Sequence, residues 1–333
     1  MSRILAWLSL GLTLFSSSLA WAAEPYGIGL EGFAYPYPVS MLVLSGESEP
    51  LRLAYMDVKP TAQANGRAVL LLHGRNFPSS YWEPTINALI GAGYRVVVPD
   101  QVGFGKSSKP LAQMSFDSLA RHTLALLDRL ALPRVDIVAH SMGGMLAVRF
   151  ARAYPERLDR LVLAAPIGLE DYRNFVPPVD TDRIIADEDR LTADGYRRQL
   201  VTNYSLTLPP DDITPFVEAR MRIKDAADYP RWLRAFVNSY QTIWSQPVVY
   251  EIPLLTQPTL FIMGANDHNA PGRAYAPEAV RPKMGDNARL ARELAARMKD
   301  GKIVVFDGIG HLVQLEAKER FNAAMLSFLN SGR

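Results

Sequence analysis

The pentapeptide Ala139-His140-Ser141-Met142-Gly143 carries the clearest chemical signal in this chain of 333 residues. It lies inside VDIVAHSMGGMLAVRF, where a buried apolar run comes before the serine and an apolar-periodic stretch comes after it. The serine is therefore expected at a sharp turn between a strand and a helix, which needs small neighbours such as Ala139 and Gly143. The helix would point its first amides at negative charge developing beside Ser141. The pattern predicts a nucleophilic serine.

Strand-like and helical segments alternate around this turn. From Ala68 onward, short continuous apolar runs such as AVLLLH, YRVVVPD and VDIVAH are separated by amphipathic stretches. Such alternation indicates a parallel sheet with helices on both faces, and right-handed crossovers make it doubly wound. Before Ala68, SMLVL and LRLAYMDV flank the turn-forming SGESEP and are expected to form a β-hairpin at the sheet edge. The predicted fold class is α/β, with a doubly wound, mostly parallel sheet.

The segment 115–130 has the clearest helical periodicity. Apolar residues recur at three- and four-residue spacing from Phe116 to Leu127, and Ser115 can cap the first turn. His122 falls off this apolar face. It is therefore expected to be a solvated helix histidine without a catalytic role.

Three further strand-like runs complete the expected sheet, at 160–166, 258–264 and 302–308. The stretch between the first two is rich in Arg, Asp, Tyr and Trp, and it is too long for a simple loop. It is expected to form a helical cap over the sheet, with a pocket between cap and core. The expected organisation is a signal peptide at 1–22, a core domain at 23–169 and 253–333, and a helical cap insertion at 170–252.

Five motifs resemble the loops of the α/β-hydrolase superfamily, and they occur in its order. They are LLLHGRNFPSSYW, PDQVGFGKSSKP, AHSMGG, GANDHNAP and GIGHLVQLEAKERF. The resemblance runs from about Leu51 to Leu329, and within the superfamily it is to the branch of capped esterases, C–C hydrolases and epoxide-hydrolase-like enzymes. Ala139 departs mildly from the family pattern, which has glycine there. The resemblance implies the α/β-hydrolase fold.

The resemblance also implies a catalytic triad in the family order of nucleophile, acid and histidine: Ser141, Asp267 and His311. A serine hydroxyl is a weak nucleophile, so His311 would accept its proton and later return it to the leaving group. Asp267 would hold the ring tautomer and stabilise the imidazolium. Asp171 and Asp307 also follow strands, but only Asp267 lies in the matching loop.

Two backbone N–H groups, those of Met142 and Arg75, are expected to form the oxyanion hole. The Arg75 side chain would either bind an acidic group of the substrate or face solvent. The other histidines of these loops are expected to be structural: His73 ties down the oxyanion loop, His140 packs or hydrogen-bonds behind the nucleophile, and His268 is a loop residue.

The function expected from this set is ester hydrolysis by a serine hydrolase through an acyl-enzyme. The alternative is hydrolysis of C–C bonds in vinylogous diketones. The pattern typical of such C–C hydrolases has Trp after the catalytic histidine and Asn before the serine, whereas this chain has Leu312 and His140 at those positions. A remote alternative is an inactive binding module, which would be suggested by a missing triad member. Nucleotide binding at Gly105-Lys106-Ser107 is disfavoured, because Asp100 occupies the place of the first P-loop glycine.

Composition is that of a soluble globular protein, with 48% hydrophobic and 21% charged residues. The 36 basic and 34 acidic residues are interspersed, so no nucleic-acid-binding face is expected. No H-E-x-x-H motif occurs, and neither a metal nor another cofactor is implied. The expected partner is a small molecule, an apolar ester. The cap is rich in aromatic residues, which either line an apolar pocket or, as is more common at such spacing, form the core of the cap: Tyr172, Phe175, Tyr204, Tyr229, Trp232, Phe236, Tyr240 and Trp244.

The N-terminal segment has the order of a secretory signal peptide. Arg3 precedes the apolar stretch ILAWLSLGLTLF, and Ala20 and Ala22 form an A-x-A site, so the mature chain would begin at Ala23. The apolar run is shorter than the roughly 20 residues that span a bilayer, and a chain without cysteine cannot carry a lipid on an N-terminal cysteine. The expected location is the periplasm or the medium, without a stable membrane anchor.

Overall fold

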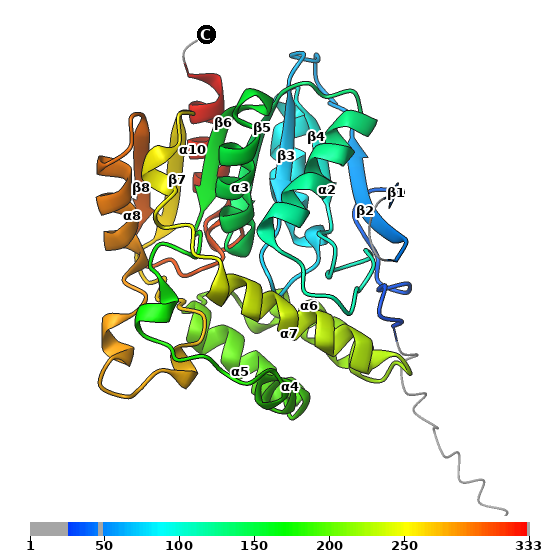
Figure 1. Ribbon diagram of the computed structural model, residues 1–333. Coiled ribbons are helices and arrows are strands. Elements are labelled where there is room, and N and C mark those ends of the chain that lie inside the picture. The colour runs from blue at the N-terminus through cyan, green and yellow to red at the C-terminus, as the bar shows by residue number, and fades with distance from the viewer. Residues whose placement is uncertain (1–25, 46–48, 332–333) are drawn as a thin grey trace, which may run out of the picture.

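The computed structural model describes residues 26–45 and 49–331, so the predicted signal peptide at 1–22 lies outside the described residues. The described chain forms one mixed sheet in the strand order β1-β2-β4-β3-β5-β6-β7-β8, with helices on both faces (Figure 1). The strands are β1 Val39–Leu44, β2 Leu51–Val58, β3 Ala68–Leu72, β4 Arg95–Pro99, β5 Val135–His140, β6 Leu158–Ala164, β7 Thr259–Gly264 and β8 Gly301–Phe306.

Strands β3 to β8 pair in parallel, while β1 and β2 form the predicted hairpin at one edge. Leu44 pairs with Leu51 across the hairpin, and β2 is also antiparallel to β4. The parallel strands β3, β5 and β7 are buried on both faces, which their continuous apolar sequences require. The predicted α/β class with a doubly wound, mostly parallel sheet is confirmed.

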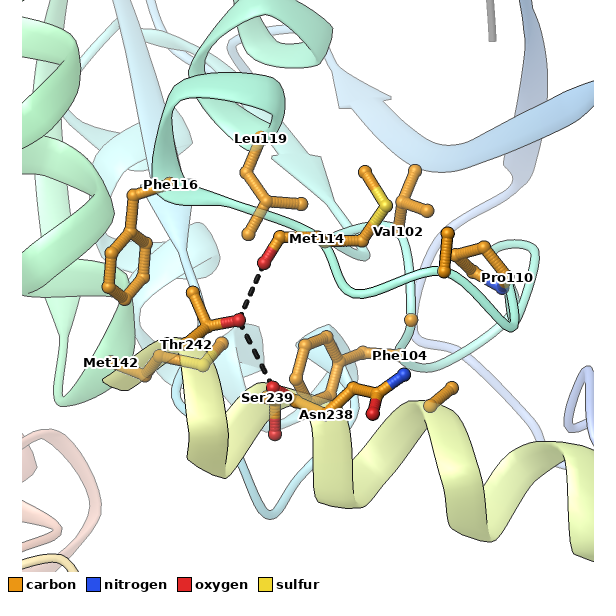
Figure 2. Close-up of a pocket in the computed structure, with 13 residues that line it drawn as sticks. Val102, Phe104, Pro110, Met114, Phe116, Leu119, Met142, Asn238, Ser239 and Thr242 are labelled. Atoms are coloured by element: carbon orange, nitrogen blue, oxygen red, sulfur yellow. Dashed lines mark hydrogen bonds between the residues drawn. The ribbon is translucent and has the colours of Figure 1, made fainter. Parts of the chain in front are cut away.

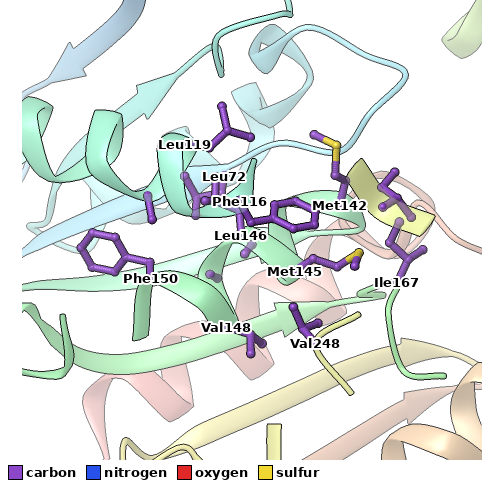
Figure 3. Close-up of a cluster of buried hydrophobic side chains, with 14 of the residues drawn as sticks. Leu72, Phe116, Leu119, Met142, Met145, Leu146, Val148, Phe150, Ile167 and Val248 are labelled. Carbon is purple, nitrogen blue, oxygen red and sulfur yellow. The ribbon is translucent and has the colours of Figure 1, made fainter. Parts of the chain in front are cut away.

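Two apolar cores cover the two faces of the sheet. Alternate residues of β3 show the division, because Leu70 and Leu72 join one core while Val69 and Leu71 join the other. The first core lies under α2 and α3, where Figure 3 shows part of it, and under α8, and the second lies under α1, α9 and α10. These helices are α1 Glu83–Gly91, α2 Phe116–Arg129, α3 Met142–Ala153, α8 Asn287–Ala296, α9 Val313–Glu316 and α10 Lys318–Asn330.

Helix α2 begins as its sequence predicts, because the Ser115 side chain accepts a hydrogen bond from the backbone N–H of Ser118 (3.0 Å). The prediction that His122 is solvated is wrong, since its exposed fraction is only 4%. Helix α2 packs against α3 as well as against the sheet. Its buried face is therefore wider than the single apolar stripe seen in the sequence.

Four helices between β6 and β7 form a separate layer at the end of the sheet where β5 runs into α3 (Figure 1). They are α4 Thr181–Asp189, α5 Ala193–Tyr204, α6 Pro210–Lys224 and α7 Tyr229–Ser245. In residues 26–45 and 49–331 no helix is long and apolar enough to cross a membrane.

Candidate active site

The turn between β5 and α3 has the strain that its sequence predicts. Ser141 has φ 55° and ψ −120°, a conformation that L-residues seldom adopt. A Cβ at Gly143 would lie 2.5 Å from the Leu72 carbonyl oxygen and 2.7 Å from that of His73, so only glycine fits there. The end of β3 therefore presses against the first turn of α3 and holds Ser141 at the tip of the elbow.

The side chains of Ser141, Asp267 and His311 meet at this elbow. His311 Nε2 lies 2.9 Å from Ser141 Oγ, and its Nδ1 lies 2.9 Å from Asp267 Oδ2. All three residues are at least 97% buried. A carboxylate oxygen only accepts hydrogen bonds, so Nδ1 carries the ring proton and the Nε2 lone pair faces the serine hydroxyl. This arrangement can remove a proton from Ser141.

The two rival carboxylates lie elsewhere. Asp171 Oδ2 accepts hydrogen bonds from Arg173 (2.7 Å) and from the Tyr250 hydroxyl (3.0 Å). These partners, with Arg173 the largest influence, hold the pKa of Asp171 below its usual value. Asp307 is exposed. Of the three candidates, the structure brings Asp267 to His311.

His140 links the oxyanion loop to the histidine loop. The Gly74 N–H donates to the Tyr81 hydroxyl (3.0 Å), which lies 2.9 Å from His140 Nδ1, and His140 Nε2 lies 3.0 Å from the His311 carbonyl oxygen. The carbonyl can only accept, so Nε2 carries the proton and Nδ1 accepts from the Tyr81 hydroxyl. Burial and the nearby His311 ring lower the pKa of His140 well below its usual value. His140 is thus a neutral, structural histidine.

His73 ties down the oxyanion loop in the same way. Its Nδ1 lies 2.6 Å from the Gly74 carbonyl oxygen, and its Nε2 accepts from the Gln101 N–H (2.8 Å). Burial lowers the pKa of His73. A Cβ at Gly74 would lie 3.0 Å from Ser141 Cβ, so this loop passes directly beside the candidate nucleophile.

The two residues expected at the oxyanion hole flank Ser141 in the structure. Met142 is the first residue of α3, and Arg75 follows Gly74 in the loop beside the serine. The Met142 side chain points into a small apolar pocket of about 20 Å³ between α7 and the segment 102–119 (Figure 2). That volume is about the size of a water molecule, and the Met142 side chain does not line the cavity that contains Ser141.

The Arg75 side chain is mostly buried, and it lines the cavity that contains Ser141. It turns toward α7, where Nε donates to Ser239 Oγ (2.9 Å) and the guanidinium lies 3.8 Å from the centre of the Phe236 ring. It also pairs with Glu188 (3.6 Å), which Arg220 binds from the other side (2.6 Å). Although burial alone would raise the pKa of Glu188, Arg220 and Arg75 hold it below its usual value. Arg75 therefore joins the oxyanion loop to the helical layer.

Sequence reasoning missed Asn269, whose side-chain Nδ2 lies 3.2 Å from His311 Nε2. It competes with Ser141 for the same ring lone pair. Its backbone is anchored on both sides, because its N–H donates to Asp267 Oδ1 (3.0 Å) and its carbonyl oxygen accepts from Asn287 (2.9 Å). The motif GANDHNAP contains this residue, but its spacing from Asp267 alone does not show that it reaches the histidine.

Glu316 is a second residue that the sequence analysis did not single out. Its carboxylate accepts from the N–H groups of Gly310 (3.1 Å) and Leu312 (2.9 Å), on either side of His311, and from the Thr207 N–H (2.9 Å). Glu316 thus holds the histidine loop and ties it to the segment after α5. The sequence signal that could have identified Glu316 is its place in the motif GIGHLVQLEAKERF, five residues after His311.

The glycine-lysine-serine segment at 105–107 encloses a carboxylate. Asp100 accepts hydrogen bonds from the N–H groups of Ser79 (2.9 Å) and Lys106 (2.8 Å). A Cβ at Gly105 would collide with the same carboxylate. Asp100 therefore fills the space that a phosphate would need.

Ser141 opens into a cavity of about 490 Å³ between the sheet and the helical layer. This volume suits a small-molecule substrate. Of the aromatic residues expected in a pocket, Tyr204 and Tyr240 line it, while Trp232 and Phe236 pack in the core of the helical layer. The other lining residues mix apolar and polar side chains, including Ile167, Ile184, Leu200, Glu188, Asn203, Asn269, Arg273 and Arg281. Within the described part of the chain, no group of three or more His, Cys, Asp or Glu side chains could hold a metal ion.

Comparison with known proteins identifies the family. Residues 67–279 match the model of the alpha/beta hydrolase fold family. The chain belongs to the α/β-hydrolase family, as its motifs indicated.

Individual relatives are more divergent. A 2-hydroxy-6-oxononadienedioate/2-hydroxy-6-oxononatrienedioate hydrolase of Burkholderia vietnamiensis is 31% identical, over 84% of this chain and 91% of its own. The crystal structure of a probable hydrolytic enzyme from Pseudomonas aeruginosa PAO1 is 41% identical and superposes with a TM-score of 0.89, over 93% of this chain and 99% of the other. An esterase from Exiguobacterium antarcticum, 19% identical with a TM-score of 0.67 over 87% and 98% of the chains, shares the fold.

Proposed function

We propose that the protein is a serine hydrolase that cleaves carboxylic esters. The observation that supports this most directly is the line of contacts from Asp267 through His311 to Ser141, at 2.9 Å each, at the wall of a substrate-sized cavity. The strained elbow adds support, since it places Ser141 at the start of α3 and at the wall of the cavity.

The reaction would run in two halves. Ser141 Oγ attacks the acyl carbon while His311 Nε2 takes the hydroxyl proton, and the N–H groups of Met142 and Arg75 stabilise the oxyanion. His311 then gives the proton to the departing alcohol, which leaves an acyl group on Ser141. Water, activated by His311 in the same way, releases the acid and restores the serine. Asp267 keeps the Nε2 lone pair directed at Ser141 throughout.

The test is hydrolysis of p-nitrophenyl esters from acetate to decanoate by the purified mature protein. Saturable turnover of at least one ester, with kcat/KM that depends on chain length, would support the proposal. The absence of turnover across the panel and of labelling by a serine-reactive fluorophosphonate would contradict it and favour an inactive binding module.

A second candidate is hydrolysis of a C–C bond in a vinylogous diketone. The name of the Burkholderia vietnamiensis relative favours it. Two positions beside the candidate triad weigh against it. The C–C hydrolase pattern has Trp after the histidine and Asn before the serine, whereas this chain has Leu312 and His140 there. Loss of the absorbance of a 2-hydroxy-6-oxo-dienoate, measured beside the ester panel, distinguishes the two: kcat/KM should be higher for the ester.

Asn269 should set the pH range in which His311 acts as a base. In Asn269→Asp a carboxylate would face Nε2 and stabilise the protonated ring, because an opposite charge favours the ionised form. The acid limb of kcat/KM against pH should therefore move upward by about one pH unit or more. Asn203→Asp is the control, since it puts the same charge in the cavity wall without a contact to His311. Equal profiles for both variants would show that Asn269 has no direct effect on the base.

We also propose export from the cytoplasm, on the order of Arg3, apolar core and A-x-A site. N-terminal sequencing of protein from the cell envelope or medium should begin at Ala23 or within one or two residues of it. Protein that keeps Met1 and remains in the cytoplasm would contradict export.

A further inference from the structure

Two arginines on one segment form a lip of the active-site cavity. Arg273 and Arg281, called here the cationic lip, lie between Asp267 and α8, and both line the cavity that contains Ser141. This segment, drawn in orange in Figure 1, reaches the helical layer, where the Tyr275 hydroxyl donates to Asp187 of α4 (3.1 Å). The lip therefore borders the space between sheet and helices.

Neutral carbonyl groups hold both guanidinium groups. Arg273 donates to the carbonyl oxygens of Arg281 (3.1 Å) and His268 (3.3 Å). Arg281 donates to those of Ala276 (2.9 Å) and Ala274 (3.2 Å). These bonds orient the two side chains but do not cancel their charge. Each guanidinium has five N–H donors, so each keeps donors for a ligand.

In the described part of the chain, no carboxylate of the cavity wall is paired with the positive charge of the cationic lip. Among the described residues neither lip arginine forms an ion pair, and Glu188 is the one carboxylate that lines the cavity. Arg75 and Arg220 already bind Glu188. Burial raises the pKa of Glu170, and the positive charge of Arg273 acts against that increase, but Glu170 does not line the cavity. The cavity thus has an excess of positive charge at its lip.

We propose that the cationic lip binds a carboxylate at the end of the substrate remote from the scissile bond. A guanidinium matches a carboxylate with two parallel N–H donors, and two guanidinium groups without a paired carboxylate among the described residues attract an anion to the mouth of the cavity. The preferred substrates are then monoesters of dicarboxylic acids, with the apolar chain beside Ile167, Ile184 and Leu200. This inference rests on the proposed hydrolysis at Ser141.

The experiment compares matched esters that differ only in the terminal group. The mono-p-nitrophenyl esters of succinate, adipate and suberate are measured against p-nitrophenyl butyrate, hexanoate and octanoate. For at least one length, kcat/KM of the parent should be about tenfold or more higher for the anionic ester. The double variant Arg273→Gln/Arg281→Gln should lose that factor, mainly through KM, and stay within about twofold on the neutral ester.

Two control variants separate charge from folding. Arg292→Gln removes one exposed charge from α8, outside the cavity, and should keep the preference. Arg273→Lys/Arg281→Lys keeps the charge and should retain most of it. Equal losses on anionic and neutral esters in the Gln variant would overturn the proposal, because the arginines would then only brace the loop. A parent enzyme without any preference for the anionic esters would overturn it too.

A binding measurement tests the cationic lip separately from catalysis. Monomethyl adipate should bind the Ser141→Ala protein, and the two Gln substitutions should weaken its Kd about tenfold in calorimetry. If the parent hydrolyses no ester yet this difference is found, the proposed function fails and the lip stands. If esters are hydrolysed and binding is unchanged by the Gln substitutions, the lip assignment fails alone.

Discussion

Ser141→Ala should reduce ester hydrolysis by about a million-fold in kcat while the protein stays folded, because the substitution removes the atom that would attack the acyl carbon. The change deletes one oxygen from a buried side chain whose backbone conformation is set by Gly143 and the end of β3. The midpoint of thermal unfolding should therefore remain close to that of the parent. Steady-state kinetics on one p-nitrophenyl ester and a melting curve measure the two quantities.

Ser245→Ala is the matched control, because Ser245 is an exposed serine at the end of α7. It should keep the activity of the parent. A fluorophosphonate probe should label the parent and Ser245→Ala on the peptide that contains Ser141, and should not label Ser141→Ala. More than a few per cent of parental turnover in Ser141→Ala would end the assignment of the nucleophile.

Asp267→Asn should slow the enzyme by about ten-thousand-fold. The carboxylate accepts from His311 Nδ1, and an amide N–H in its place would donate to Nδ1 and move the ring proton to Nε2. Ser141 would then have no lone pair to receive its proton, and the imidazolium would lose its counter-charge. The amide oxygen can still accept from the Asn269 N–H, so the loop should keep its shape.

The comparison uses kcat/KM against pH for the parent, Asp267→Asn, Asp171→Asn and Asp307→Asn on one short-chain ester. For the parent, kcat/KM should rise with pH, because a general base must be unprotonated to take the proton from Ser141. Asp171→Asn and Asp307→Asn should stay within a few-fold of the parent. If Asp307→Asn instead showed the large loss of kcat/KM, the acid of the triad would have to be reassigned from Asp267 to Asp307.

The sheet and the elbow could be predicted because short stretches of sequence specify them. Continuous apolar runs such as AVLLLH form strands buried on both faces, and the small residue Gly143 permits the tight turn after Ser141. The hairpin at the sheet edge has the same local origin, since a turn-forming segment separates two apolar runs. These features depend on residues that are near each other in the chain.

The surroundings of the candidate triad depend on residues far apart in the chain. Asn269 approaches His311 across 42 positions, Arg75 reaches the carbonyl of Phe236 across 161, and His140 contacts the His311 carbonyl across 171. The spacing of residues within one motif does not predict contacts between such distant positions. The burial of His122 was mispredicted for the same reason, because α3 covers a second side of its helix.

The sequence by itself determined the fold class, the position of the elbow and the order in which Ser141, Asp267 and His311 follow their strands. Hydrophobic period and residue size suffice for the fold class and the elbow, since they act within one element or one turn. The order of the three residues follows instead from the resemblance of their loops to those of the family. Only the tertiary structure decided what the Arg75 side chain binds, that Asn269 reaches His311 and where the charge of Arg273 and Arg281 lies. Those outcomes depend on the packing of separate elements, which brings distant side chains within hydrogen-bond reach.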